Sequence, residues 1–173
     1  MEIVIPRPGL VILCGPAACG KSTFARRHFR PTQIVSSDRC RAMLTDSAGA
    51  QWASSQAFEL FHTIIEKRLA LGRLTVADST ALSKEARRDL RRIARAAGAP
   101  VVLIIFNISE KTCLERDEKR RRRVGEEVVA AHVDKLNAAL GDTRRERYHA
   151  VYILDEKEMD RARMKKTKKH SQS

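Results

Sequence analysis

Residues 15–22 read GPAACGKS, which fits the pattern G-x-x-x-x-G-K-S. An apolar run, residues 10–14, comes directly before them, and a segment compatible with a helix, residues 22–29, follows. A strand, a glycine-rich turn and a helix are the context in which this pattern forms a phosphate-binding P-loop. Glycines let backbone N–H groups converge on phosphate oxygens, and the positive end of the helix dipole adds to the attraction. We therefore predict a phosphate site here rather than a chance glycine turn.

Two side chains of this loop can act directly on a bound triphosphate. Lys21 can reach the outer phosphates, and the Ser22 hydroxyl can coordinate Mg²⁺. The residues that we assign to nucleotide binding in the loop are Gly15, Pro16, Ala17, Ala18, Cys19, Gly20, Lys21, Ser22 and Thr23.

Apolar, β-rich runs alternate with helix-like segments along the chain. The runs cover residues 10–14, 33–36, 74–77, 101–106 and 150–154, and helical patterns cover 56–71, 83–97 and 126–140. This alternation predicts an α/β fold with a central parallel sheet flanked by helices. We expect one P-loop domain over residues 1–155, followed by a basic tail or linker over residues 156–173.

The composition narrows the class of protein. The 173 residues include 34 basic and 21 acidic side chains, and the net charge of +13 favours a polyanionic partner. No apolar run approaches the about 20 residues of a membrane span, and no signal peptide is evident. The four cysteines form no C-x-x-C pair, and the histidines show no metal-ligand spacing. We expect a reduced, cytoplasmic protein without structural zinc.

Two carboxylates follow predicted strands, at the edge of a parallel sheet where ligands bind. Asp38 comes after the second strand and Asp78 ends the third, so both are expected to face the P-loop. One carboxylate can hold Mg²⁺ or its waters, and the other can accept a proton from an attacking hydroxyl. The alternatives are that Asp38 caps a short helix and that Asp78 is a buried, hydrogen-bonded carboxylate. Residues 74–78, LTVAD, favour the metal role for Asp78, directly or through water.

An arginine-rich run covers residues 116–123. Arg116, Arg120 and Arg123 fall at positions i, i+4 and i+7, which predicts one shared helix face, whereas Arg121 and Arg122 point elsewhere. A mobile helix that brings these guanidinium groups over a triphosphate would act as a lid. The open alternative is a solvated basic face.

The chain resembles the polynucleotide 5′-kinase domain of bacterial polynucleotide kinase-phosphatase, an RNA end-healing and sealing enzyme. The resemblance extends to about Leu154, and its most specific parts are residues 15–23, 35–41, 67–80 and 113–116. The element Ser-Ser-Asp-x-x-Arg, in register with the P-loop, discriminates far better than the loop alone.

The resemblance implies a role for each matching residue on the donor side. Lys21 and Ser22 would bind the phosphates and Mg²⁺ of ATP or another nucleoside triphosphate. Arg116 and Arg120 would be lid arginines on the donor phosphates.

On the acceptor side, the resemblance implies that RNA or DNA 5′-hydroxyl ends are the substrate. Asp38 would be the general base on the 5′-hydroxyl, and Arg41 would contact the neighbouring phosphate. Gln51 would help to hold the acceptor strand. The resemblance implies a repair enzyme that can carry phosphatase and ligase modules. Neither of their sequence patterns occurs in these residues, so such modules would lie elsewhere in a longer parent chain.

The chain departs from the family at one position, and two other functions are also compatible with the sequence. Many relatives have Asn where this chain has Ala81, so a role tied to that amide is in doubt. A small-metabolite or nucleoside kinase would share the P-loop, the Asp and the lid. A nucleic-acid-binding module whose P-loop only gates binding is the alternative from another class.

Overall fold

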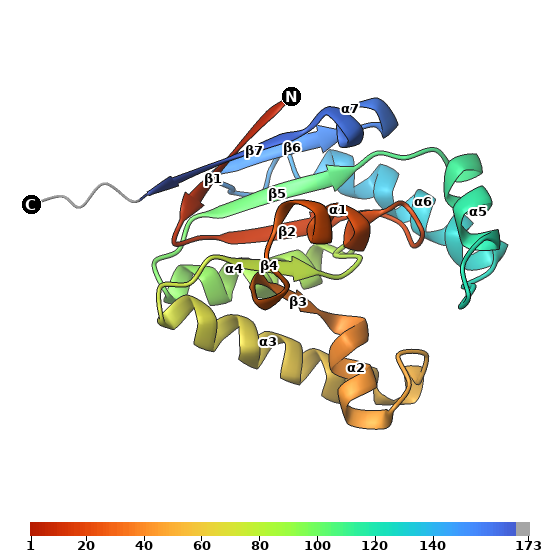
Figure 1. Cartoon of the computed structure of the whole chain (residues 1–173), viewed down its shortest axis with the longest axis horizontal. Coiled ribbons are helices and arrows are strands. Elements are labelled where there is room, and N and C mark those ends of the chain that lie inside the picture. The colour runs from red at the N-terminus through yellow and green to blue at the C-terminus, as the bar shows by residue number, and fades with distance from the viewer. Residues whose placement is uncertain (169–173) are drawn as a thin grey trace, which may run out of the picture.

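Residues 1–168 are described by a computed structural model, in which five parallel strands form the central sheet (Figure 1). The strand order is β3-β4-β2-β5-β6, so the strand that precedes the P-loop lies at the centre. The carboxyl ends of β3 and β4 consequently lie beside that loop. The strands are β2 (Leu10–Cys14), β3 (Ile34–Ser36), β4 (Thr75–Asp78), β5 (Val101–Phe106) and β6 (Ala150–Leu154).

Helices cover both faces of the sheet, which confirms the predicted α/β architecture (Figure 1). Helices α3 and α4 pack on one face, and α1 and α5 pack on the other. No helix within residues 1–168 is both long enough and apolar enough to cross a membrane. The helices are α1 (Lys21–His28), α2 (Ser37–Thr45), α3 (Ser54–Ala70), α4 (Lys84–Ala96), α5 (Glu110–Glu118), α6 (Glu126–Asp142) and α7 (Glu156–Arg161), with short 3-10 turns η1 (Pro31–Gln33) and η2 (Gln51–Ala53).

Alternate residues of β2 belong to two separate apolar clusters. Leu10 and Ile12 pack in the cluster that contains α3 and α4, whereas Val11 and Leu13 pack in the cluster that contains α1. All four side chains are essentially buried. Burying one such side chain stabilises the fold by about 1.5–3 kcal/mol. A strand that is buried on both faces reads as a continuous apolar run, which is why the sequence pattern locates it well.

The structure corrects the expected tail over residues 156–173. Residues 156–168 are folded: α7 begins at a capping box between Asp155 and Glu158, and β7 (Arg163–Lys168) pairs in parallel with β1 (Glu2–Arg7) in a separate two-stranded sheet. The physical reason is burial, because Ile3 in β1 is fully buried and β7 completes its hydrogen bonding. Residues 169–173 of the expected tail lie outside the described residues.

Candidate nucleotide and acceptor site

The P-loop connects β2 to the N-terminus of α1, and its glycines are needed for two different reasons. A Cβ at Gly15 would lie 3.0 Å from Cβ of Phe106 and 3.2 Å from its carbonyl oxygen, so a larger residue would push the loop and β5 apart. Gly20 has a φ of 104°, a conformation that side chains with a Cβ rarely adopt. Ala18 nevertheless takes a φ of 59°. The loop therefore turns sharply enough to present its backbone N–H groups at the start of α1.

Lys21 is nearly buried at the mouth of the loop. Its Nζ donates to the carbonyl oxygen of Gly15 at 2.8 Å and also to that of Pro16. An ammonium group held by two carbonyls of the same loop is already positioned beside the N–H groups. It can exchange these neutral acceptors for phosphate oxygens, with which its hydrogen bonds are stronger because both partners are charged.

His132, in α6, contacts the P-loop, although no sequence motif assigns it to the site. Its Nδ1 accepts a hydrogen bond of 3.2 Å from the backbone N–H of Ala17. Burial, followed by the nearby Lys21 and Lys135, lowers the pKa of His132, so the ring is neutral at pH 7 and able to accept. The residue occupies the inward side of an apolar helix, where the sequence pattern resembles ordinary core.

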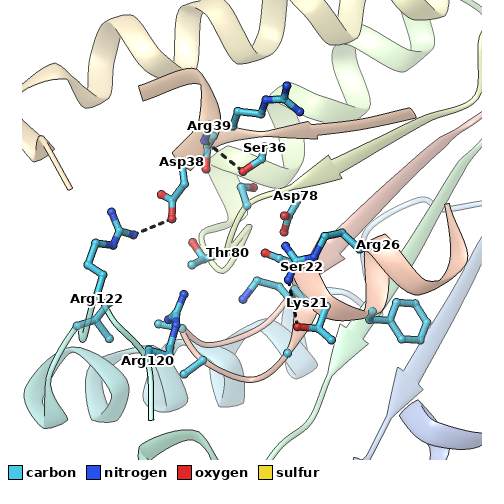
Figure 2. Close-up of a pocket in the computed structure, with 18 of the residues that line it drawn as sticks. Lys21, Ser22, Arg26, Ser36, Asp38, Arg39, Asp78, Thr80, Arg120 and Arg122 are labelled. Atoms are coloured by element: carbon cyan, nitrogen blue, oxygen red, sulfur yellow. Dashed lines mark hydrogen bonds and ion pairs between the residues drawn. The ribbon is translucent and has the colours of Figure 1, made fainter. Parts of the chain in front are cut away.

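Ser22 and Asp78 supply the oxygen atoms that a Mg²⁺ ion prefers. Asp78 ends β4 beside Leu13 of β2 and is 6% exposed, and Figure 2 shows it close to Ser22. Burial raises the pKa of Asp78, and the hydrogen bond from Ser22 and the charge of Lys21 offset part of that rise. A divalent cation would favour the ionised carboxylate. These two residues therefore fit the ion that a bound triphosphate carries.

Asp38 lies in the first turn of α2 but does not cap that helix. The cap is Ser36, whose Oγ accepts the backbone N–H of Arg39 at 3.3 Å. The carboxylate of Asp38 instead accepts from two arginines, with Oδ1 at 2.7 Å from Nη1 of Arg41 and Oδ2 at 2.8 Å from Nη2 of Arg122. Figure 2 shows the Arg122 guanidinium pointing directly at this carboxylate.

Arg41 is held in place by the segment that follows α2. It is 4% exposed, and it donates to the carbonyl oxygen of Ala48 at 3.0 Å and to Oγ of Ser54 at 3.3 Å. Ser54 in turn donates to Oε1 of Gln51 at 3.1 Å. The three predicted acceptor-side residues, Asp38, Arg41 and Gln51, thus belong to one connected hydrogen-bond network.

The arginine-rich run does not continue as a helix. Helix α5 ends at Glu118, so Arg120 and Arg123 do not share a helix face with Arg116, and the predicted helical lid is wrong in this respect. The buried carboxylate of Asp117 accepts the backbone N–H groups of Val124 and Gly125, which turns the chain back toward α6. The spacing of residues in the sequence does not predict this turn.

The arginines nevertheless converge on the site. Arg116 donates to the carbonyl oxygen of Cys19 in the P-loop at 2.7 Å. Arg116, Arg120, Arg122 and Arg123 all line the same cavity, so the expectation that Arg122 points elsewhere is also wrong. Ala81 is buried and does not line the cavity, and its carbonyl oxygen accepts from Arg87.

The side chains with a proposed chemical role line one cavity of about 1500 Å³: Lys21, Ser22, Asp38, Arg41, Gln51, Asp78 and the four arginines of the arginine-rich run. Most ligand pockets measure about 300–1,000 Å³, so this one has room for a nucleotide and a second substrate. Nine basic side chains and three acidic side chains line it. The cavity is therefore suited to anionic ligands on both its donor and its acceptor side.

A family model described as an AAA domain matches residues 10–142, which is well over half of the sequence. The chain belongs to the AAA domain family. The match covers the P-loop, both carboxylates and the arginine-rich run. No curated protein matches the chain.

Solved structures share the fold at low sequence identity. A protein of the Pnkp1/Rnl/Hen1 RNA repair complex is 21% identical, with a TM-score of 0.69 over 82% of this chain and 47% of that one. A putative kinase from Chloroflexus aurantiacus j-10-fl is 16% identical, with a TM-score of 0.60 over 86% and 88%. A gluconokinase from Sinorhizobium meliloti 1021 is 18% identical, with a TM-score of 0.53 over 87% and 83%. The chain thus has the P-loop kinase fold, and it spans about half the length of the RNA repair protein.

Proposed function

We propose that this domain transfers the γ-phosphoryl group of a nucleoside triphosphate to the 5′-hydroxyl end of RNA or DNA. The observation that carries the proposal is the Asp38 carboxylate, held between Arg41 and Arg122 in the cavity that also contains Lys21 and Ser22. A carboxylate opposite a phosphate-binding loop is where an acceptor hydroxyl must lose its proton.

On the donor side, the residues bind and neutralise the triphosphate. The P-loop N–H groups and Lys21 take the phosphates, while Arg116, Arg120 and Arg123 add positive charge from the other side of the cavity. Ser22 and Asp78 would hold Mg²⁺, which neutralises charge that develops on the phosphate oxygens. Phosphoryl transfer needs mainly alignment and charge neutralisation, and these side chains supply both.

On the acceptor side, Asp38 accepts the proton of the attacking 5′-hydroxyl while Arg41 and Gln51 hold the neighbouring phosphate. The two guanidinium groups hold the Asp38 carboxylate in one orientation, with one oxygen bonded to each. Because Arg41 is fixed by Ala48 and Ser54, it can bind a phosphate without losing much side-chain freedom.

The charge of the cavity favours a polynucleotide over a small neutral metabolite. A gluconokinase shares this fold, and a kinase for a sugar could use the same carboxylate and loop. Five basic side chains of the cavity lie outside the set that we assign to the triphosphate, and an uncharged sugar has no need of them: Arg26, Arg27, Arg39, Arg41 and Arg122. An RNA repair protein also shares the fold, and we propose that phosphatase or ligase modules accompany this domain in a longer parent protein.

The test is incubation with γ-labelled ATP and Mg²⁺ and three acceptors: a nucleoside, its 3′-monophosphate and a 5′-hydroxyl oligonucleotide. A charge-assisted contact from Arg41 contributes about 1.5–3 kcal/mol, so kcat/KM for the 3′-monophosphate should exceed that for the nucleoside at least tenfold. Arg41→Ala should erase most of this difference. Efficient phosphorylation of an uncharged sugar would support the small-metabolite kinase instead, and no transfer to any acceptor would support a binding module.

A further inference from the structure

A second hollow lies at the opposite edge of the sheet from the P-loop. It measures about 380 Å³, and its lining residues come from the end of β1, the last turn of α3 and the segments that precede β3 and β4. Four arginines line it: Arg7 at the end of β1, Arg30 before β3, and Arg68 and Arg73 before β4. We call these four residues the distal arginine site.

The charges of the distal arginine site have no acidic counterpart. No acidic side chain lines the hollow, and none of its four arginines forms an ion pair within residues 1–168. Arg68 is fixed by hydrogen bonds to Oγ1 of Thr75 at 3.3 Å and to the carbonyl oxygen of Leu74 at 3.0 Å. Burial lowers the pKa of Arg68, and the nearby positive charge of Arg73 lowers it further. Uncompensated cations that are held together favour a bound anion.

The distal arginine site adjoins the main cavity along one segment of the chain. Pro31 and Ile34 line the main cavity, whereas Arg30, Thr32 and Gln33 line the second hollow. Turn η1 therefore has the main cavity on one side and the distal hollow on the other. Arg26 and Arg27 of α1, just before this turn, add positive charge to the main cavity.

We propose that the distal arginine site binds backbone phosphates of the acceptor strand downstream of its 5′ end, an inference that rests on the proposed function. The strand would run from Asp38 past η1 to the amino-terminal edge of the sheet. A five-residue β-strand is about 17 Å long, which corresponds to about five stacked nucleotides. The site should therefore act only on acceptors longer than about five nucleotides.

The test compares two triple variants that lose the same positive charge. Arg7→Gln/Arg30→Gln/Arg73→Gln removes three exposed members of the site and keeps Arg68 with its backbone contacts. Arg88→Gln/Arg92→Gln/Arg95→Gln is the matched control, because these arginines are exposed on α4 and line neither hollow. Equal melting temperatures for the two variants and the wild type establish that each variant folds.

We expect the distal variant to raise KM for a 12-nucleotide 5′-hydroxyl acceptor at least tenfold at low salt, with kcat unchanged. KM for a nucleoside 3′-monophosphate should stay the same, and the control variant should match the wild type on both acceptors. The slope of log affinity against log salt for the 12-nucleotide strand should flatten by about two, since each lost phosphate contact contributes about 0.7. An unchanged KM for the longer strand, or an equal rise in the control variant, would overturn the proposal.

Direct binding separates failure of this inference from failure of the proposed function. If the wild type phosphorylates no strand, the proposed function fails. Fluorescence anisotropy with a labelled 12-nucleotide strand then judges the distal arginine site alone, and equal affinity for the wild type and the distal variant overturns it. Inorganic pyrophosphate is the second probe. If the distal variant loses affinity for pyrophosphate but not for the strand, the site binds a free anion and the strand assignment is wrong.

Discussion

The orientation of the Asp38 carboxylate depends on two guanidinium groups, one nearby in the sequence and one distant from it. Arg41 follows it in α2, whereas Arg122 reaches it at 2.8 Å from the turn after α5. The Asp38–Arg122 ion pair therefore bridges two walls of the cavity. A side chain that both orients the proposed base and bridges the cavity should matter for phosphoryl transfer, even though it does not contact the P-loop.

Replacing Arg122 tests this role. We expect Arg122→Ala to lower kcat/KM for phosphoryl transfer about tenfold or more, because a charge-assisted contact to the base is lost. Arg121→Ala is the matched control, since Arg121 is exposed, adjacent and outside the cavity lining, and its steady-state kinetics should stay within about twofold of wild type. Equal losses in the two variants would mean that the run acts only as a general basic surface.

The residues of the site that sequence reasoning finds are those whose position follows from the sheet. Lys21 and Ser22 belong to a motif, and Asp38 and Asp78 follow strands, so topology alone brings them to one edge. Arg122 could not be found in this way, because its position depends on where α5 ends. His132 could not be found either, since its contact with Ala17 is made across the fold.

At the scale of elements, a buried ion pair ties the start of α4 to the segment before β6. Arg87 is fully buried, and its guanidinium lies 2.8 Å from Oε1 of Glu146. It also donates to the carbonyl oxygens of Ala81 and Leu82, behind the loop that follows β4. The network thus supports the loop that follows Asp78 at the end of β4.

Breaking this network should cost stability. Arg87→Met leaves the carboxylate of Glu146 buried without its partner, so the free energy of unfolding should fall by about 3–5 kcal/mol in urea titrations. Arg88→Met is the control, because Arg88 is exposed on the same helix and should change the value by less than about 0.5 kcal/mol. A loss below about 1 kcal/mol for Arg87→Met would show that the pair is dispensable.

The same network makes the stability of the fold depend on pH. Burial raises the pKa of Glu146, but hydrogen bonds from Arg87 and Tyr148 outweigh it, and the net shift is downward. The stabilisation is therefore present above the ordinary pKa of about 4.3 and is lost as pH falls through the lower folded value. Glu146→Gln should remove this part of the acid sensitivity in unfolding experiments.

The strands that the sequence analysis misses are those in which apolar residues alternate irregularly with proline or charged residues. Strands β2 and β5 read as continuous apolar runs and were predicted, whereas β1 contains Pro6 and charged ends, and β7 is mostly basic. The sequence of β7 does not identify it as a strand, because its extended conformation depends on the hydrogen bonds that it forms with β1.

At the scale of the whole molecule, the net charge of +13 is not spread evenly. The main cavity extends from the P-loop to η1, where the distal hollow begins, and basic side chains outnumber acidic ones in both. Composition alone predicts a polyanionic partner, but only the fold shows that the charge gathers in two hollows that adjoin at η1. This distribution supports the proposed polynucleotide acceptor.

The most direct test of the central claim is single-turnover transfer of labelled γ-phosphate from ATP to a 5′-hydroxyl RNA strand, by the wild type and by Asp38→Asn. Asn keeps the shape of the side chain but cannot act as a base, and Ser36 still caps α2. The account predicts that the wild type labels the strand at its 5′ end, and that the variant binds ATP and RNA normally but transfers no label. Near-normal transfer by Asp38→Asn, or a wild type that labels only free sugars, would contradict it.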